Sequence, residues 1–249
     1  MTKLSVNVNK IATLRNTREL EIPNIAHLSR IALQAGADGL TVHPRPDERH
    51  IRSYDVDALA RLLGEFPRAE FNIEGNPYHG LIEHCRRVRP TQATLVPDAT
   101  DAFTSNSGWQ LGKMSNDQCE TLRYAVAELH EVGCRVSLFM DPLPDLMPLA
   151  KELGADRVEL YTEPFATAFA AGEGESQTPH YAAAAVAAQE LELGVNGGHD
   201  LNLHNLDAFL SAVHGVAEVS IGHALIADAL EFGMAETVKR YLAICRSEK

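Results

Sequence analysis

Short apolar runs alternate with longer amphipathic segments along the whole chain. Brief runs rich in β-branched and aromatic residues are typical of buried strands, whereas apolar residues spaced three and four apart are typical of helices. The pattern predicts eight strands, at Leu4–Val8, Gly39–His43, Glu70–Glu74, Gln92–Pro97, Arg135–Met140, Arg157–Tyr161, Gly194–Asn196 with the residues leading into it, and Glu218–Ile221.

Segments with helical spacing lie between these strands. The predicted helices are Ile25–Ala35, Val56–Leu63, Tyr78–Val88, Asn116–Val132, Leu146–Leu153, His180–Leu193, Leu206–Val213 and Leu225–Ile244. Three of the predicted turns from helix to strand contain a glycine, at Gly36, Gly133 and Gly154. Glycine readily adopts the left-handed conformation that ends many helices, so these positions predict sharp stops.

The number of repeats indicates the fold. Eight strand–helix repeats in 249 residues match a (β/α)8 barrel, which typically has about 250 residues. We therefore predict the α/β class, as a single (β/α)8 TIM barrel domain over residues 1–249. A doubly wound sheet is the alternative, but the chain lacks the GxGxxG pattern typical of dinucleotide-binding sheets.

Polar residues stand at the end of every predicted strand, where a barrel carries its active site. They are Asn7, Asn9, His43, Glu74, Asp98, Asp141, Tyr161, Thr162, Asn196–His199, Gly222 and His223. The second strand ends in His43-Pro44-Arg45-Pro46, and proline cannot continue a sheet. His43 therefore stands at a strand tip, with Arg45 and His50 on the loop after it. An imidazole beside guanidinium groups suits phosphate binding and proton transfer.

Charge is distributed unevenly along the chain. The formal net charge is −12, yet residues 1–52 carry eight Lys/Arg against five Asp/Glu, a balance of +3. A basic segment in an acidic protein predicts a local site for anionic ligands. The overall negative charge argues against general nucleic-acid binding.

Other features of the composition favour a reduced, cytoplasmic protein. No apolar run approaches the roughly 20 residues that span a bilayer, and the N-terminus has no signal-peptide core. The four cysteines are far apart and show no CxxC spacing, which is typical of buried thiols. We expect small phosphorylated molecules as partners, with no membrane and no nucleic acid.

Glycine-rich segments end the last two predicted strands, at Val195–Asp200 and Ile221–His223. Barrels commonly build a phosphate site from these two loops. Together with the first strands, they give the chain a clear similarity: it resembles the pyridoxine 5′-phosphate synthase family. The runs that carry the resemblance lie in order along nearly the whole chain, at Val6–Asn16, Gly39–Ile51, Asn72–Gly75, Leu95–Pro97, Val195–His199 and Ile221–His223.

The resemblance implies a fold and a reaction. Members of this family are (β/α)8 barrels that condense 1-deoxy-D-xylulose 5-phosphate with 3-amino-2-oxopropyl phosphate. The products are pyridoxine 5′-phosphate, inorganic phosphate and water. The resemblance implies no metal and no organic cofactor, and it implies assembly as a homo-octamer. Two phosphorylated substrates would account for the basic N-terminal segment.

The resemblance also assigns roles to single residues. His43 and Glu74 match the family's proton acceptors, and His199 matches its proton donor. Residues matched to contacts with the aminoketone phosphate are Asn7, Arg18, Asp200, Gly222 and His223. Residues matched to contacts with deoxyxylulose phosphate are Asn9, Lys10, Arg45, His50 and Thr104. The chemistry needs groups that titrate near neutrality, so a catalytic Glu74 requires a pKa raised by burial or by neighbouring charge.

The chain departs from the common family pattern at three places. Asn9-Lys10 stands where many members have Asp-His, and Lys10 adds a charge for a substrate phosphate. Asp200 stands where many members have glycine, so we expect its backbone rather than its side chain to contact ligand. Glu19-Leu20-Glu21 follows Arg18 where glycines are common, which changes the composition of the first loop.

Two other functions remain open at this point. One is a metal-assisted barrel aldolase or epimerase acting on sugar phosphates, with Glu74, His199 and Asp141 as ligands. The other is a non-enzymatic protein that binds a phosphorylated metabolite. Glu74 has a structural alternative as the ion-pair partner of a basic loop. For Trp109, the interpretation is packing of the loop after the fourth strand against the barrel.

Overall fold

The computed structural model describes residues 1–98, 105 and 107–247. Its strands are all parallel and close into a barrel in chain order, because β1 pairs with β8 as well as with β2. The strands are β1 Lys3–Asn7, β2 Gly39–Val42, β3 Glu70–Gly75, β4 Gln92–Leu95, β5 Arg135–Met140, β6 Arg157–Tyr161, β7 Gly194–Gly198 and β8 Val216–Ile221. The predicted (β/α)8 TIM barrel is confirmed.

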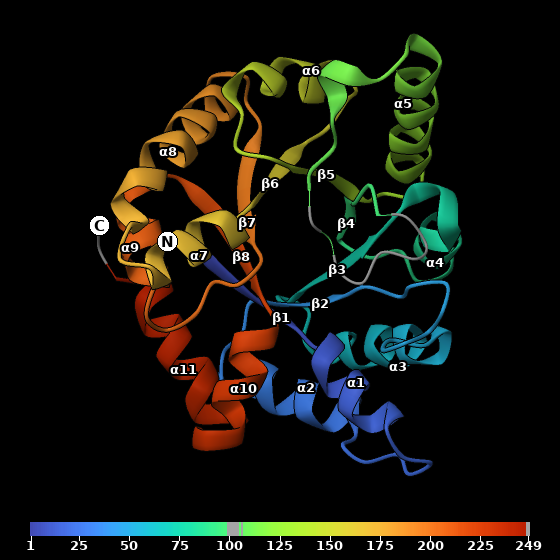
Figure 1. Cartoon of the computed structure of the whole chain (residues 1–249). Coiled ribbons are helices and arrows are strands. Elements are labelled where there is room, and N and C mark those ends of the chain that lie inside the picture. Colours follow the sequence, from blue (N-terminus) through green and yellow to red (C-terminus); the bar gives the residue numbers. More distant parts are fainter. Residues whose placement is uncertain (99–104, 106, 248–249) are drawn as a thin grey trace.

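Helices surround this barrel on its outer side (Figure 1). They are α1 Asn9–Asn16, α2 Ile25–Gln34, α3 Ser53–Leu63, α4 Ile82–Val88, α5 Asn116–Glu131, α6 Met147–Glu152, α7 Glu163–Ala170, α8 Gly174–Glu190, α9 Leu206–Ala212, α10 His223–Phe232 and α11 Met234–Cys245. Short turns of other helical types occupy Pro77–Leu81, Leu111–Lys113 and Pro144–Leu146. Over the described residues, no helix is both long and apolar enough to cross a membrane.

The predicted strands are all found, with small shifts at their ends. β2 ends at Val42, so His43 is the first residue beyond it, and β4 ends at Leu95 rather than at Pro97. The three predicted glycine stops are confirmed, since Gly36, Gly133 and Gly154 have φ angles of +107°, +92° and +91°. Each glycine lets the chain drop from a helix directly into the next strand.

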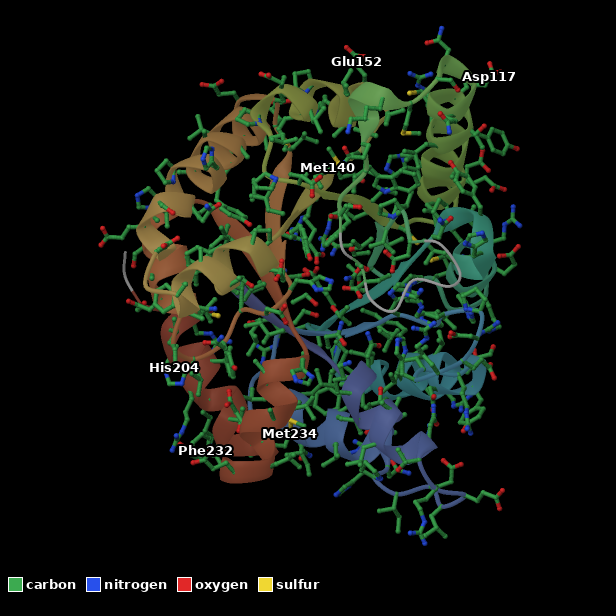
Figure 2. All side chains as sticks on the ribbon, in the orientation of Figure 1. Asp117, Met140, Glu152, His204, Phe232 and Met234 are labelled. Atoms are coloured by element: carbon green, nitrogen blue, oxygen red, sulfur yellow. The ribbon has the colours of Figure 1, made fainter. Side chains whose placement is uncertain are left out.

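The sequence pattern missed two helices and merged two others. In α1 the buried apolar side chains are only Ile11 and Ala12, too few for a visible helical period. The helix α7 was missed as well, and α8 begins before the predicted start at His180. The predicted helix Leu225–Ile244 is divided at Gly233, between Phe232 of α10 and Met234 of α11 (Figure 2).

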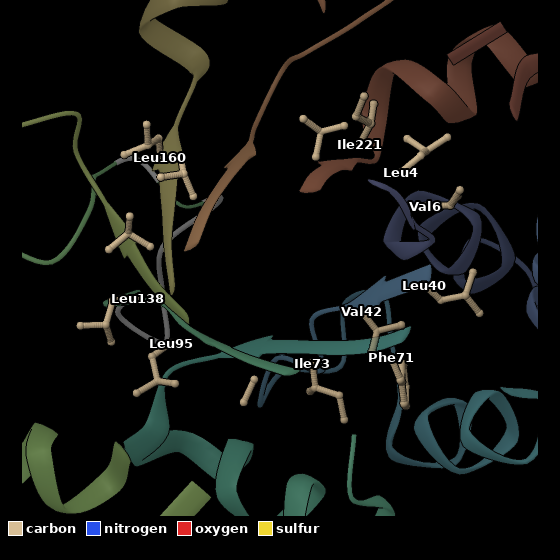
Figure 3. Close-up of a cluster of buried hydrophobic side chains, with 14 of the residues drawn as sticks. Leu4, Val6, Leu40, Val42, Phe71, Ile73, Leu95, Leu138, Leu160 and Ile221 are labelled. Carbon is tan, nitrogen blue, oxygen red and sulfur yellow. The ribbon is translucent and has the colours of Figure 1, made fainter. Parts of the chain in front are cut away.

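The hydrophobic core lies between the sheet and the helices. Alternate strand residues point outward and are almost fully buried there (Figure 3), including Leu4, Val6, Leu40, Val42, Phe71, Ile73, Leu95, Leu138, Leu160 and Ile221. Strand side chains alternate between the two faces of a sheet. The remaining strand residues therefore point into the barrel.

The inside of the barrel is lined by polar side chains. Thr41 Oγ1 lies 2.7 Å from Ser5 Oγ and accepts a bond of 3.4 Å from Asn72 Nδ2. Across the barrel, Gln92 Nε2 on β4 donates to Glu218 Oε1 on β8 at 3.4 Å. Many barrels fill this space with branched apolar residues. Here a hydrogen bond links opposite walls of the barrel, and the polar side chains form a floor beneath the site.

Candidate active site

Glu74 and His43 stand side by side at the mouth of the barrel. Val42 pairs with Ile73 in the register of β2 and β3, which brings the next residues of the two strands level with each other. Asn7 Nδ2, at the end of β1, donates to Glu74 Oε2 at 3.4 Å. The backbone N–H of His43 donates to Asn9 Oδ1 at 2.9 Å. Four residues predicted for the site thus lie together at the carboxyl ends of the first three strands.

The protein environment moves both groups toward their neutral forms. Burial raises the pKa of Glu74 well above its ordinary value, and the nearby carboxyl groups of Glu159 and Asp98 raise it further. Burial also lowers the pKa of His43 well below its ordinary value, with further lowering by His50 and Arg45. A carboxyl group with a raised pKa beside a neutral imidazole is suited to proton transfer. Within the described residues, the hydrogen-bond partner of Glu74 is Asn7 and no ion pair involves it.

The loop after β2 carries the predicted phosphate contacts. Arg45 Nη1 donates to Asp98 Oδ2 at 2.8 Å, and both side chains are buried. The His50 ring centroid lies 6.1 Å from that of His43. Burial, followed by the charges of Arg45 and Lys10, lowers the pKa of His50 to about 4. The arrangement places N–H donors of Arg45 and a neutral His50, with the charge of Lys10 nearby, on this side of the mouth, where an anion would be stabilised.

His199 follows the end of β7 in a constrained backbone. Its φ angle is +83° and that of Asp200 is +59°, so two consecutive non-glycine residues are left-handed. The Thr162 hydroxyl donates to the carbonyl of Gly198 at 2.7 Å and also contacts that of His199. Glycine would adopt this conformation at position 200 without the cost that Asp200 carries.

Two aromatic rings flank the His199 imidazole. The Phe139 and Tyr161 ring centroids lie 5.5 Å and 5.3 Å away. Burial lowers the pKa of His199, and the carboxylates of Asp200 and Asp98 partly offset this. A substrate phosphate bound beside the ring would favour the imidazolium form, which is the form that donates a proton.

Gly222 and His223 complete the mouth next to β1. His223 is the first residue of α10, and Gly222 precedes it. A Cβ atom at Gly222 would lie 3.1 Å from Asn7 Cβ, so glycine permits the close approach of these two loops. A helix N-terminus with free N–H groups favours an anion. This side of the mouth is therefore a second place for a phosphate.

One predicted residue is not brought to the mouth, and another cannot be placed from the described residues. Arg18 lies on the exposed segment after α1, where it lines a groove of about 810 Å³ with Arg15 and Arg52. No strand-end residue lines that groove. Thr104 lies outside the described residues. The roles of both stay predictions.

Glu159 is a candidate that sequence reasoning missed. It lies in the middle of β6, is only 2% exposed, and points into the barrel. Burial and the neighbouring Glu218 raise its pKa to about 8. A Cβ atom at Gly198 would lie 2.2 Å from Glu159 Oε1, so this carboxyl group packs directly beneath the residue before His199. A charged residue inside an apolar strand is the signal in the sequence, and it lies away from the strand ends at which barrels carry their active sites.

Trp109 packs as expected. Its indole is buried and Nε1 donates to the carbonyl of Leu95 at 2.9 Å. Asp141, one ligand of the metal-assisted alternative, accepts bonds from the Gly108 N–H at 2.9 Å and from Gln110 Nε2 at 2.7 Å. A search of the described residues finds no group of three or more His, Cys, Asp or Glu side chains that could hold a metal ion. The geometry gives that alternative no support.

Known sequences match the chain almost from end to end. Residues 4–247 match the family described as "Pyridoxal phosphate biosynthesis protein PdxJ". The chain belongs to the PdxJ family. A pyridoxine 5′-phosphate synthase of Albidiferax ferrireducens is 54% identical over 248 residues, which cover 97% of this chain and 96% of that protein. A pyridoxine 5′-phosphate synthase of Allorhizobium ampelinum is 50% identical over 247 residues, covering 98% and 97%.

Solved structures similar to this member of the PdxJ family share its fold at low identity. A thiamine phosphate pyrophosphorylase from Pyrococcus furiosus has a TM-score of 0.58 at 12% identity, covering 98% of this chain and 95% of that one. A tryptophan synthase from M. tuberculosis has a TM-score of 0.64 at 11% identity, covering 99% and 94%. At these identities the likeness concerns the fold alone.

Proposed function

We propose that this chain is a pyridoxine 5′-phosphate synthase. It condenses 1-deoxy-D-xylulose 5-phosphate with 3-amino-2-oxopropyl phosphate to give pyridoxine 5′-phosphate, inorganic phosphate and water. One observation carries the proposal: in a PdxJ-family barrel, Glu74 and His43 stand level at the mouth with pKa values moved in opposite directions by burial.

The reaction requires several proton transfers at one place. The substrate amine attacks the ketone and water leaves, carbon-bound protons are removed, phosphate is eliminated, and the ring closes with loss of water. His43 and Glu74 accept protons in this scheme, and His199 donates one to a leaving oxygen. Each transfer is fastest when the group titrates near the working pH. A protein that only binds phosphates has no need for these shifted groups.

The two sides of the mouth supply two anion sites. Arg45, His50, Lys10 and Asn9 would hold the deoxyxylulose phosphate beside β2, with Thr104 as a further contact. Asn7, Gly222, His223 and the backbone of Asp200 would hold the aminoketone phosphate beside β1 and β8, with Arg18 as a further contact. We also propose that the chain works as a single-domain subunit of a cytoplasmic homo-octamer, which the family resemblance supports.

One assay tests the proposal. Purified protein is mixed with both phosphorylated substrates, and pyridoxine 5′-phosphate is followed by its fluorescence. Product is expected only when both substrates are present, and treatment with a chelator should leave the rate unchanged. Binding of both phosphates without product would favour the non-enzymatic alternative. A rate lost to the chelator and restored by one divalent ion would favour the metal-assisted alternative.

A further inference from the structure

A buried ion pair lies beneath the loop that carries His50. Arg15, the penultimate residue of α1, is 3% exposed and donates from Nη1 and Nη2 to the two carboxylate oxygens of Asp55, at 2.5 and 2.9 Å. The backbone N–H of Arg52 donates to Asp55 Oδ2 at 2.8 Å. Asp55 lies in the first turn of α3. The bidentate pair thus fixes the position of the Arg15 guanidinium relative to α3.

This pair orients the side chain of Asn16. Arg15 Nε and Nη2 both donate to Asn16 Oδ1, at 3.1 and 2.9 Å. A guanidinium has donors only, so the amide oxygen must face Arg15 and the amide nitrogen must face the opposite way. Hydrogen bonding to Arg15 therefore fixes which way the Asn16 amide group points.

The amide nitrogen of Asn16 faces three carbonyl groups of the loop. Its Nδ2 donates to the carbonyls of Glu48, Arg49 and His50 at 3.3, 3.2 and 2.8 Å. Glu48 has a φ of +50°, an uncommon left-handed conformation for a residue other than glycine. Such a conformation persists where surrounding contacts fix it. Asn16 supplies those contacts at the point where the three carbonyls converge.

One peptide group connects the Asn16 side chain to the His50 ring. The carbonyl between His50 and Ile51 accepts from Asn16 at 2.8 Å and from Arg15 Nη2 at 3.4 Å. The N–H of the same peptide donates to His50 Nδ1 at 2.9 Å. Nδ1 is therefore an acceptor without a proton, and the proton of the neutral ring is on Nε2. The ring offers one N–H donor beside the positive charge of Arg45.

We propose that Asn16, oriented by the Arg15–Asp55 pair, is a positioning residue that fixes the His50–Ile51 peptide so that His50 Nε2–H points to the substrate phosphate. The inference rests on the proposed function, because it takes deoxyxylulose phosphate as the ligand of this loop. The ion pair between Arg15 and Asp55 is sufficient to hold α1 against α3, so Asn16 is not needed for that contact. Among the described residues, the side-chain N–H groups of Asn16 donate only to carbonyl groups of the loop that carries His50. Their role is therefore to fix the shape of the phosphate site.

Two substitutions separate the donor from the acceptor of Asn16. Asn16→Ala removes both, whereas Asn16→Asp keeps an oxygen for Arg15 and removes the N–H groups that hold the loop. Both variants should raise KM for deoxyxylulose phosphate about tenfold, on the scale of a lost hydrogen bond. Turnover and KM for the aminoketone phosphate should stay within about twofold of the native values. Isothermal calorimetry with deoxyxylulose phosphate alone should show the same loss of affinity.

A matched control is Asn24→Ala. The Asn24 side chain caps α2 by accepting from the N–H of His27 at 2.8 Å, outside the loop. This variant should lose thermal stability and keep both KM values. The inference is overturned if Asn16→Asp keeps native affinity, or if the Asn16 variants lose turnover and both affinities together. Where Asn16→Ala fails to fold, Asn16→Asp decides. If native protein makes no product, the proposed function fails, and calorimetry still compares the variants.

Discussion

At the scale of single residues, burial sets the pKa values, and so the protonation states, of the titratable groups at the mouth of the barrel. Glu74 is moved toward its protonated form and His43 toward its neutral form. Neither shift comes from a salt bridge in the described residues: the Glu74 carboxyl group accepts from the side-chain amide of Asn7, and the backbone N–H of His43 donates to that of Asn9. The proposed catalytic role of Glu74 can therefore be tested without breaking an ion pair.

Glu74→Gln is the decisive residue-scale substitution. Glutamine keeps the size of the side chain and an oxygen for Asn7, but it cannot accept a proton. Turnover should fall by about 10²–10⁴-fold, the usual contribution of general-base catalysis. The KM values should change little, because the loss falls on the transition state. Turnover, KM and melting temperature are measured on the same preparation, and near-native turnover in a folded variant would remove Glu74 from the mechanism.

The placement of most candidate residues at the mouth of the barrel could be predicted residue by residue, and the exceptions have a common cause. His43, Glu74 and His199 were found because strand ends in a barrel converge. Glu159 was missed because its position depends on which strand residues point inward and on a contact with Gly198 from the next strand. The Asn16 contacts were missed because they join segments more than thirty residues apart. Sequence spacing carries no information about such contacts.

At the scale of elements, the strands were easier to predict than the helices. Buried strands in this barrel carry apolar residues at every second position, and Leu4–Val6 and Val158–Leu160 show this directly. The helix α1 rests on few apolar contacts and is held instead by Arg15 and Asn16. Because α1 is held by polar contacts with other segments and not by an apolar face, its sequence shows no helical period of apolar residues.

The junction of α10 and α11 allows a test at this scale. Gly233 has φ +78° and ψ +149°, a region that is accessible almost only to glycine. No atom lies within 4 Å of a Cβ atom built there, so Gly233→Ala introduces backbone strain without a clash. The free energy of unfolding should fall by about 1–3 kcal/mol, which lowers Tm by roughly 2–4 °C per kcal/mol.

The control for that substitution is Gly112→Ala. Gly112 has an ordinary φ, and its Cβ would only reach van der Waals contact with Leu146 Cδ2 at 3.4 Å. Circular dichroism should show that the Gly233 variant melts earlier than the Gly112 variant, with equal turnover at low temperature. Equal melting temperatures would contradict the assignment of strain to Gly233.

At the scale of the whole molecule, the buried carboxyl groups make stability depend on pH. The pKa of Glu159 is raised from an ordinary 4.5 to about 8 in the folded chain. Between these values the folded state holds a proton that the unfolded state has released. Raising the pH through this window therefore favours unfolding, and above the folded pKa the loss is complete.

Glu159→Gln should remove this contribution, because the amide resembles the protonated carboxyl group and does not titrate. Compared with native protein, the variant should gain several degrees in Tm between pH 5 and pH 9, since roughly 2–4 °C corresponds to 1 kcal/mol in chains of this size. Glu74 and Glu218 titrate in the same direction in both proteins, and the substitution also removes the charge that raises the pKa of Glu74, so the difference between the two melting curves reports Glu159 together with its coupling to these neighbours. A Tm difference that is constant with pH would refute the assignment.

Residues of one strand are under two different constraints, depending on whether they face the helices or the inside of the barrel. Leu160 faces the helices and contributes packing, while Glu159 faces the lining and contributes charge and hydrogen bonding. Consecutive residues of one strand thus have few partners in common, and changes without shared partners tend to be additive. During divergence, relatives can repack the outside of the barrel while the lining stays fixed, or alter the lining without refitting the helices. The residues that pack against the helices and the residues that line the barrel can therefore change independently during evolution, although the two kinds alternate along the same strands.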